Sequence, residues 1–276
     1  KSSDLSLTSA EIEVSGAAEL TAQDTITATD ANVTSDSLTM TAETGSVEAS
    51  DFMATVAGQA LVEAGDSVTL DGSKLGLGAL TASAKSGDLS LKSAEIEVSG
   101  AAKLTAQDSI TATDANVTSN SLTMTAETGS VEASRLITIV ADQALVEAGD
   151  SVTLDNAELT AGALTATAKK GNLSVKDAEV TTKTGGVTLT AEAADINASN
   201  TKLTAEGEVK LTAQNSITAT DASVEADSLT MTAETGSVEA TGFTATVTGQ
   251  ASVVAGDSVM LDNAELTAGS LTATAT

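Results

Sequence analysis

The sequence contains no cysteine, proline, histidine, tryptophan or tyrosine, and only two phenylalanines among its 276 residues. Without cysteine the chain has neither disulfides nor thiolate metal ligands. Without histidine or cysteine, and with Arg135 as the one arginine, it lacks the usual nucleophile–base pairs and the basic groove of a polysaccharide lyase. The shortage of bulky aromatic side chains also predicts a thin interior rather than a broad globular core.

Basic residues are scarce as well: 12 Lys and Arg stand against 39 Asp and Glu, which gives a formal net charge of −27. A surface of this charge repels nucleic-acid phosphates and anionic lipids, so neither nucleic-acid binding nor membrane insertion is expected. Long hydrophobic runs are missing, since no stretch approaches the ~20 apolar residues of a transmembrane helix. Carboxylates attract divalent cations, but the GGxGxD spacing of calcium-binding turns does not occur. We therefore expect no cofactor, with Ca²⁺ as a minor alternative.

What the sequence does contain is a repeat of 21 residues. The segment LTMTAETGSVEAS at 38–50 returns unchanged at 122–134 and with one substitution at 229–241. An apolar residue recurs every 21 positions at Leu5, Ile26, Val47, Val68, Leu89, Ile110, Val131, Val152 and Leu173, and again at Ile217, Val238 and Val259. Such a fixed period indicates stacked structural repeats.

A longer period lies over this one, because SAEIEVSGAA begins at Ser9 and again at Ser93, so that several units were duplicated together. The chain therefore divides into super-repeats at 5–88, 89–172 and 173–276, and the last of these contains one extra, slightly longer unit near 181–203. All of them follow one pattern, so we expect a single continuous domain over 1–276.

Within each unit, apolar and polar residues alternate over three to five positions, which is typical of strands with one buried face. Gly, Asp, Asn and Ser separate three such runs per unit, so the chain turns a corner about every seven residues. A unit of three strands buries its inward face only against further copies, stacked at about 4.8 Å. The prediction is all-β: a single-chain parallel β-helix solenoid of about 13 turns, with three short strands per turn and right-handed coiling. The alternative, a trimer of interwoven chains, should repeat at each short segment, whereas only the full unit recurs.

The corner before the first strand of each unit alternates between Asp and Gly, as at Asp24, Gly45, Asp66 and Gly87. Placing a carboxylate on every second turn doubles the distance between like charges, and this is how we interpret the alternation.

Three phrases carry a resemblance: GGVTLTAEAADINAS at 185–199, EGEVKLTAQNSITAT at 206–220 and AGDSVTLDNAELTAGALTATA at 148–168. In these phrases the chain resembles the haemagglutinin-type repeats of filamentous-haemagglutinin-like adhesins and related bacterial exoproteins. The resemblance implies a right-handed β-helix, an extracellular or cell-surface location, and a role in adhesion, biofilm formation or toxin presentation. Because the chain has no proline, the Asn-Pro-Asn-Gly secretion signature of that family is not present here.

Paired carboxylates, the single arginine and paired threonines are the candidate site residues of the sequence, and none of them predicts a catalytic, cofactor-binding or metal-binding site. The carboxylates Glu43 and Glu48, repeated as Glu127 and Glu132, have the residue types of a glycosidase pair but are typical of a charged surface. Arg135 is expected in a solvated corner. Outward Thr-x-Thr pairs resemble the hydroxyl arrays of ice-binding solenoids, although β-propensity also explains them: Thr27/Thr29, Thr39/Thr41, Thr111/Thr113, Thr123/Thr125, Thr165/Thr167, Thr230/Thr232 and Thr272/Thr274.

Together these features favour a non-catalytic structural segment of a bacterial cell-surface or secreted filament, which spans distance and self-associates. A host-surface or matrix glycan is a further possible partner. The alternative is a ligand-binding solenoid that uses its threonine or acidic faces for a glycan, ice or Ca²⁺. An enzyme on the same scaffold would need a groove with clustered acids and a basic residue.

Overall fold

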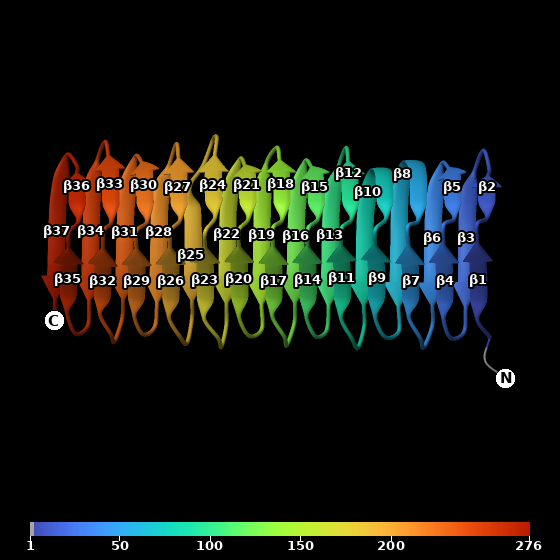
Figure 1. Ribbon diagram of the computed structural model, residues 1–276, viewed down its shortest axis with the longest axis horizontal. Coiled ribbons are helices and arrows are strands. Elements are labelled where there is room, and N and C mark those ends of the chain that lie inside the picture. Colours follow the sequence, from blue (N-terminus) through green and yellow to red (C-terminus); the bar gives the residue numbers. More distant parts are fainter. Residues whose placement is uncertain (1–2) are drawn as a thin grey trace. The chain divides into compact units, whose positions relative to one another are not determined.

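The computed structural model describes residues 3–276, and these form 37 β-strands and no helix (Figure 1). Neighbouring strands pair in parallel and stack as a β-solenoid of about 13 turns, with roughly 21 residues per turn, which confirms the predicted fold class. Each turn places one strand on each of three faces, called here the first, second and third face in chain order.

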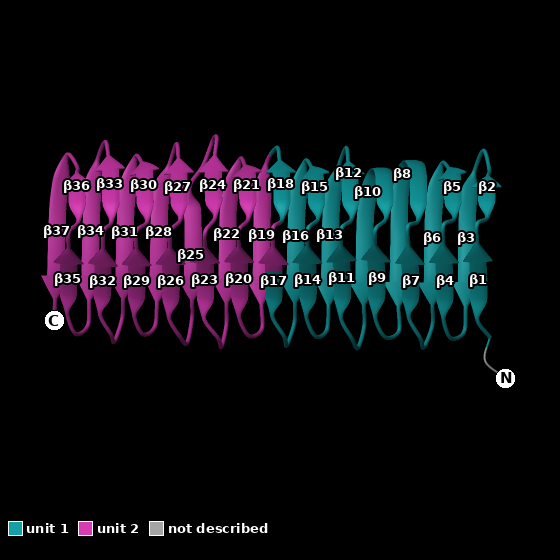
Figure 2. Cartoon of the chain, in the orientation of Figure 1, with its two compact units in different colours: residues 1–132, 136–141 teal, residues 133–135, 142–276 magenta. Residues whose placement is uncertain are grey.

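The chain divides into two compact units (Figure 2), the first within residues 1–132 and 136–141 and the second within 133–135 and 142–276. The predicted domain range of 1–276 also includes residues 1–2, which lie outside the described part. Its continuity as one solenoid across the two units stays a prediction.

The first unit has the following strands. Its first face consists of β1 (Leu5–Thr8), β4 (Ile26–Thr29), β7 (Val47–Ser50), β9 (Val68–Asp71), β11 (Leu89–Lys92) and β14 (Ile110–Thr113), while β17 (Val131–Ser134) has residues in both units. Its second face consists of β2 (Glu11–Glu13), β5 (Asn32–Ser35), β12 (Glu95–Val98), β15 (Asn116–Ser119) and β18 (Ile137–Val140). Its third face consists of β3 (Ala17–Ala22), β6 (Ser37–Ala42), β13 (Ala101–Ala106) and β16 (Ser121–Ala126).

Two turns of the first unit depart from the predicted three short strands. There β8 (Met53–Ala64) and β10 (Lys74–Ala84) run from the second face into the third without a break. The pairing of these two strands shifts register between Leu77 and Ala79, so the corner is a bend at Gly78 within extended backbone. A bulge of this kind bends a strand without ending it.

The second unit repeats the arrangement. Its first face consists of β20 (Val152–Asp155), β23 (Leu173–Lys176), β26 (Ile196–Ser199), β29 (Ile217–Thr220), β32 (Val238–Thr241) and β35 (Val259–Asp262). Its second face consists of β21 (Glu158–Ala161), β24 (Glu179–Thr182), β27 (Lys202–Ala205), β30 (Ser223–Ala226), β33 (Thr244–Val247) and β36 (Glu265–Thr267). Its third face consists of β19 (Gln143–Ala148), β22 (Ala163–Ala168), β25 (Val187–Ala191), β28 (Glu208–Ala213), β31 (Ser228–Ala233), β34 (Gln250–Ala255) and β37 (Ser270–Ala275).

The alternating pattern places the predicted ladder in the core. Ile26, Val47, Val68 and Leu89 are each 0% exposed, and each pairs with the equivalent residue of the next turn. Glu48, next to Val47, points outward and is exposed. One turn of the second unit is longer than the others, because Leu173 pairs with Ile196 and Glu179 with Lys202, both two positions beyond the usual spacing. That this turn is an extra unit of the repeat stays a prediction.

On the third face, the number of residues that separates paired positions of successive turns differs from that on the other two faces. In the first unit Leu38 pairs with Ala18 of the preceding turn and with Ala60 of the following turn, and the second separation is the longer by two positions. The alternation arises because short and long corners take turns: residues 23–25 lead into β4, but residues 43–46 lead into β7. The structural repeat at this corner is therefore two turns rather than one.

This two-turn repeat supplies a physical reason for the alternating Asp and Gly. A Cβ on Gly45 would lie 2.6 Å from the carbonyl oxygen of Asp24 in the preceding turn. The longer corner thus needs glycine because it passes close to the backbone of the shorter one, apart from any effect of charge spacing.

A ladder of side-chain acceptors runs along the same corner. The Oγ of Ser46 accepts a hydrogen bond from the backbone N–H of Ser67 (3.4 Å), and the Oγ of Ser67 accepts one from that of Asp88 (3.2 Å). The carboxylate of Asp88 then accepts from the N–H of Ser109 at 2.8 Å. In the second unit the same bonds join Asn172, Asp195, Ser216 and Ser237. This position therefore requires a short side chain with an acceptor oxygen.

Replacing one acceptor tests the ladder. Ser67→Ala leaves the N–H of Asp88 without its protein partner, and we expect it to lower the free energy of unfolding by about 0.5–1.5 kcal/mol. Ser83→Ala, on the third face and outside the ladder, is the control. Denaturant unfolding of the two variants measures the difference, and equal stability would show that the ladder contributes nothing.

The corner that follows the first-face strand adopts a left-handed backbone. In the first unit φ is 48° at Ser9, 50° at Asp30, 51° at Asp51 and 63° at Gly72. Gly, Asn and Asp tolerate this conformation best, which explains why they gather at this position. Arg135 occupies the same place with φ of 51° and is exposed, as predicted.

Candidate functional site

The candidate carboxylate pairs lie on the surface. Glu43 follows β6 at a corner and Glu48 lies outward on β7, and Glu127 and Glu132 occupy the same places after β16 and on β17. All four are exposed to solvent. All four therefore belong to a charged surface that recurs in both copies of the duplicated segment.

The threonine pairs fall on two different faces. Thr27/Thr29 and Thr111/Thr113 lie on the first face, while the other predicted pairs lie on the third. On the third face of the second unit the two main outward columns hold fourteen residues, and one of them, Glu147, is acidic. Nine are threonine: Thr165, Thr167, Thr188, Thr190, Thr212, Thr230, Thr232, Thr272 and Thr274. The other five are Leu145, Glu147, Lys210, Ser252 and Val254.

Several hollows of the first unit lie on its second face, and another lies at the corner after the first face, beside Asp51 and Gly72. Three of those on the second face have volumes of about 390, 400 and 470 Å³. Thr55 lines the first two, and Gly76 and Glu97 line the first and third, so the three adjoin one another. The sequence analysis did not predict this region. The feature that could have indicated it is Gly76, a glycine at an outward position of an otherwise alternating strand.

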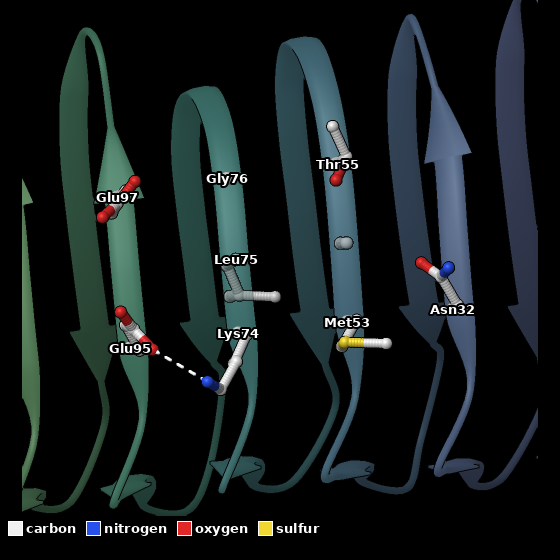
Figure 3. A pocket seen from close by; sticks show the side chains of 9 residues that line it. Asn32, Met53, Thr55, Lys74, Leu75, Gly76, Glu95 and Glu97 are labelled. Atoms are coloured by element: carbon white, nitrogen blue, oxygen red, sulfur yellow. Dashed lines mark ion pairs between the residues drawn. The ribbon is translucent and has the colours of Figure 1, made fainter.

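The first hollow is lined by polar, charged and apolar groups together (Figure 3). The Nζ of Lys74 forms an ion pair of 3.2 Å with a carboxylate oxygen of Glu95, and both side chains are about half or more exposed. Met53 is 47% exposed beside them. At this exposure the ion pair contributes little to stability.

A second such pair lies in the second unit, where the Nζ of Lys202 donates a hydrogen bond of 3.0 Å to the carboxylate of Glu179. This hydrogen bond, with the negative charge of Glu179, raises the pKa of the Lys202 ammonium. The pair joins neighbouring turns and lies at the surface.

Strand β18 reverses the polarity of its neighbours. Ile137 and Ile139 point outward and are 45% and 50% exposed, whereas Thr138 points inward and is 1% exposed. The Oγ1 of Thr138 has no hydrogen-bond partner among the described residues. The equivalent inward residue is alanine in β8 and in β33, at Ala54 and Ala245. An unpaired buried hydroxyl and two exposed isoleucines both carry a cost in free energy.

Removing the hydroxyl tests the first of these costs. Thr138→Val keeps the side-chain shape and removes an unpaired polar atom, so we expect the free energy of unfolding to rise by about 1 kcal/mol. Thermal or denaturant unfolding measures the change. A fall in stability would mean that the hydroxyl has a bonding partner, such as an ordered water.

Among residues 3–276 no cluster of three or more Asp, Glu, His or Cys side chains has the geometry to hold a metal ion. The same residues contain no helix that is long and apolar enough to cross a membrane. In comparisons with known proteins, no family, no curated protein and no solved structure matched this chain.

Proposed function

We propose that this chain is a non-catalytic structural segment of a bacterial cell-surface or secreted filament, which spans distance and self-associates. The observation that supports this most is the shared register of its copies. The duplicated segments 38–50 and 122–134 form the same strands with the same inward residues, from Leu38 and Met40 to Leu122 and Met124. The two copies therefore keep the same strand bounds and the same buried residues at these positions.

The use of polar side chains also supports a structural role. At the corner before the first face, serine, asparagine and aspartate side chains bind the backbone of the next turn rather than converging on a common point. The candidate carboxylates are exposed and repeat along the stack. Catalysis needs groups held together in a site that excludes water, and this chain spreads them out.

Electron microscopy of the purified protein, with small-angle scattering in solution, tests the proposal. A solenoid that continues through thirteen turns at about 4.8 Å gives particles about 60 Å long. We expect such particles at low concentration and larger assemblies as concentration rises, unchanged by a calcium chelator. Particles that never assemble would contradict self-association, and two unconnected globules would contradict the spacer role.

The threonine columns of the third face support a second candidate function, binding of ice or a glycan surface. Hydroxyl groups on neighbouring turns lie about 4.8 Å apart, and β-branched side chains hold them in few rotamers. From β22 to β37 the two main columns contain no acidic residue, so the threonine hydroxyls there form an uncharged surface that suits a neutral ligand.

Inhibition of ice recrystallisation and retention on immobilised polysaccharides test this candidate. The double variant Thr190→Glu/Thr232→Glu places charge on the third face, and Thr218→Glu/Thr220→Glu places equal charge on the first face. Binding that is lost only in the third-face variant would support the candidate. Absence of both activities in the unmodified protein would contradict it.

A further inference from the structure

The exposed isoleucines of β18 lie in register with a glycine on the same face. Pairing along the second face of the first unit forms one outward column through Gly76, Glu97, Thr118 and Ile139. The column beside it contains Lys74, Glu95, Asn116 and Ile137. Ile139 and Gly76 are therefore three strands apart, or about 14 Å.

The absence of a side chain at Gly76 leaves a hollow in the second face, although the backbone there does not require glycine. A Cβ built on this residue would meet nothing closer than the carbonyl oxygen of Ala54 at 3.9 Å, and its φ is not in the left-handed region. Glycine in a strand interior costs stability, so its presence here has no local reason. The hollow has a volume of about 470 Å³ and is lined by Gly76, Leu77, Glu97, Val98, Ser99 and Thr118.

We propose that this face binds a second copy of the chain in antiparallel orientation, with Ile139 of each copy in the Gly76 hollow of the other. The two copies are related by a two-fold axis that lies between their faces, parallel to the strands and midway between β12 and β15. Under this rotation each outward column of one copy lies opposite the same column of the other copy, and the order of turns is reversed. The rotation brings Ile139 over Gly76 and Ile137 against the aliphatic stem of Lys74. The inference rests on the self-association in the proposed function and names its surface.

The charges of the intervening strands fit this arrangement. The same axis brings Glu95 opposite Asn116 and Glu97 opposite Thr118, so each carboxylate faces a side chain that can donate a hydrogen bond. A two-fold axis along the solenoid would instead bring Glu95 opposite Glu97, which places like charges together. Copies with a net charge of −27 repel each other in general, so association depends on a surface where acidic groups have uncharged partners.

The proposed contact between the two copies is small, so its test needs a wide range of protein concentration and salt. Four strands of one face bury less than the standard area of a stable complex, so the association is weak. It should also strengthen with salt, because salt screens the repulsion between copies. Sedimentation equilibrium of the full chain over a wide concentration range, at low and high salt, is the suitable measurement.

Two variants alter the contact, and a third serves as the control. Gly76→Gln fills the hollow, and Ile139→Thr introduces the residue type already found at Thr118 in the same column. Val14→Thr removes an exposed apolar side chain outside the contact, since Val14 follows β2 in register with the inward residue Ser35 and is 36% exposed. We expect each of the first two to weaken dimerisation at least tenfold and the control to change it less than twofold, with thermal unfolding confirming that all three fold.

The outcomes separate the inference from the proposed function. Dimers that persist in Gly76→Gln and Ile139→Thr would overturn the inference and leave self-association through another surface. An unmodified protein that stays monomeric at every concentration and salt would overturn both. Because the chain has no cysteine, Gly76→Cys mixed with Ile139→Cys should form disulfide-linked heterodimers. Linked homodimers of Ile139→Cys in their place would overturn the antiparallel orientation.

Discussion

Val47→Asp is expected to lower the free energy of unfolding by at least about 3–5 kcal/mol, and to unfold the turns around it. Val47 is 0% exposed and lies between Ile26 and Val68 in the stacked core of the first unit. An aspartate there has neither water nor a basic partner, so its charge is uncompensated or its carboxyl must take up a proton.

Glu48→Lys is the matched control, because Glu48 is the next residue and points outward. A change of charge on this exposed side chain should alter stability by about 0.5 kcal/mol or less. Denaturant unfolding followed by circular dichroism compares the two variants. Equal stabilities would show that the inward and outward residues of β7 are assigned to the wrong sides.

A pair of glycine substitutions is expected to have opposite effects. Gly65→Ala should lower the free energy of unfolding by about 1–3 kcal/mol, because its Cβ would lie 2.7 Å from the Cα of Thr44 and closer still to the carbonyl oxygen of Glu43. Gly76→Ala should raise it by about 0.4–1 kcal/mol, because its Cβ enters open space and restricts the unfolded chain.

Thermal unfolding of both alanine variants provides the measurement, and only the sign of the difference is needed. If both variants lost stability equally, the close approach of successive turns at Gly65 would not be the reason for glycine at this corner. If Gly76→Ala were destabilising, the hollow on the second face would be smaller than the structure shows.

The fold could be predicted because its determinants are local and periodic. One buried residue at the same position of every repeat, alternation within each run, and Gly, Asp, Asn or Ser between runs were enough to place Ile26, Val47 and Val68 in one stack. The longer turn between Leu173 and Ile196 could be located for the same reason, since two additional residues interrupt an otherwise regular period. Every turn buries the same positions of the repeat, so an assignment made for one turn applies to the next.

The finer features depend on contacts between turns, which periodicity does not reveal. The alternation of shorter and longer spacings on the third face follows from corners of different length passing over each other at Asp24 and Gly45. The acceptor ladder through Ser67 and Asp88 looks in the sequence like ordinary turn composition. Strand β18 follows the alternation but places Ile137 and Ile139 outside and Thr138 inside, against the rule that apolar residues face the core.

In the parallel β-solenoid one chain makes successive turns of the stack, and a distance between two spin labels in the first unit tests this directly. Labels on Thr27→Cys and Thr111→Cys lie in one outward column of the first face, four strands apart, and no native cysteine interferes. Pulsed dipolar spectroscopy should give about 19 Å plus the reach of the labels. In a trimer of interwoven chains, strands of the other two chains would separate successive copies. The same labels would then lie about 58 Å apart, and that result would contradict the account.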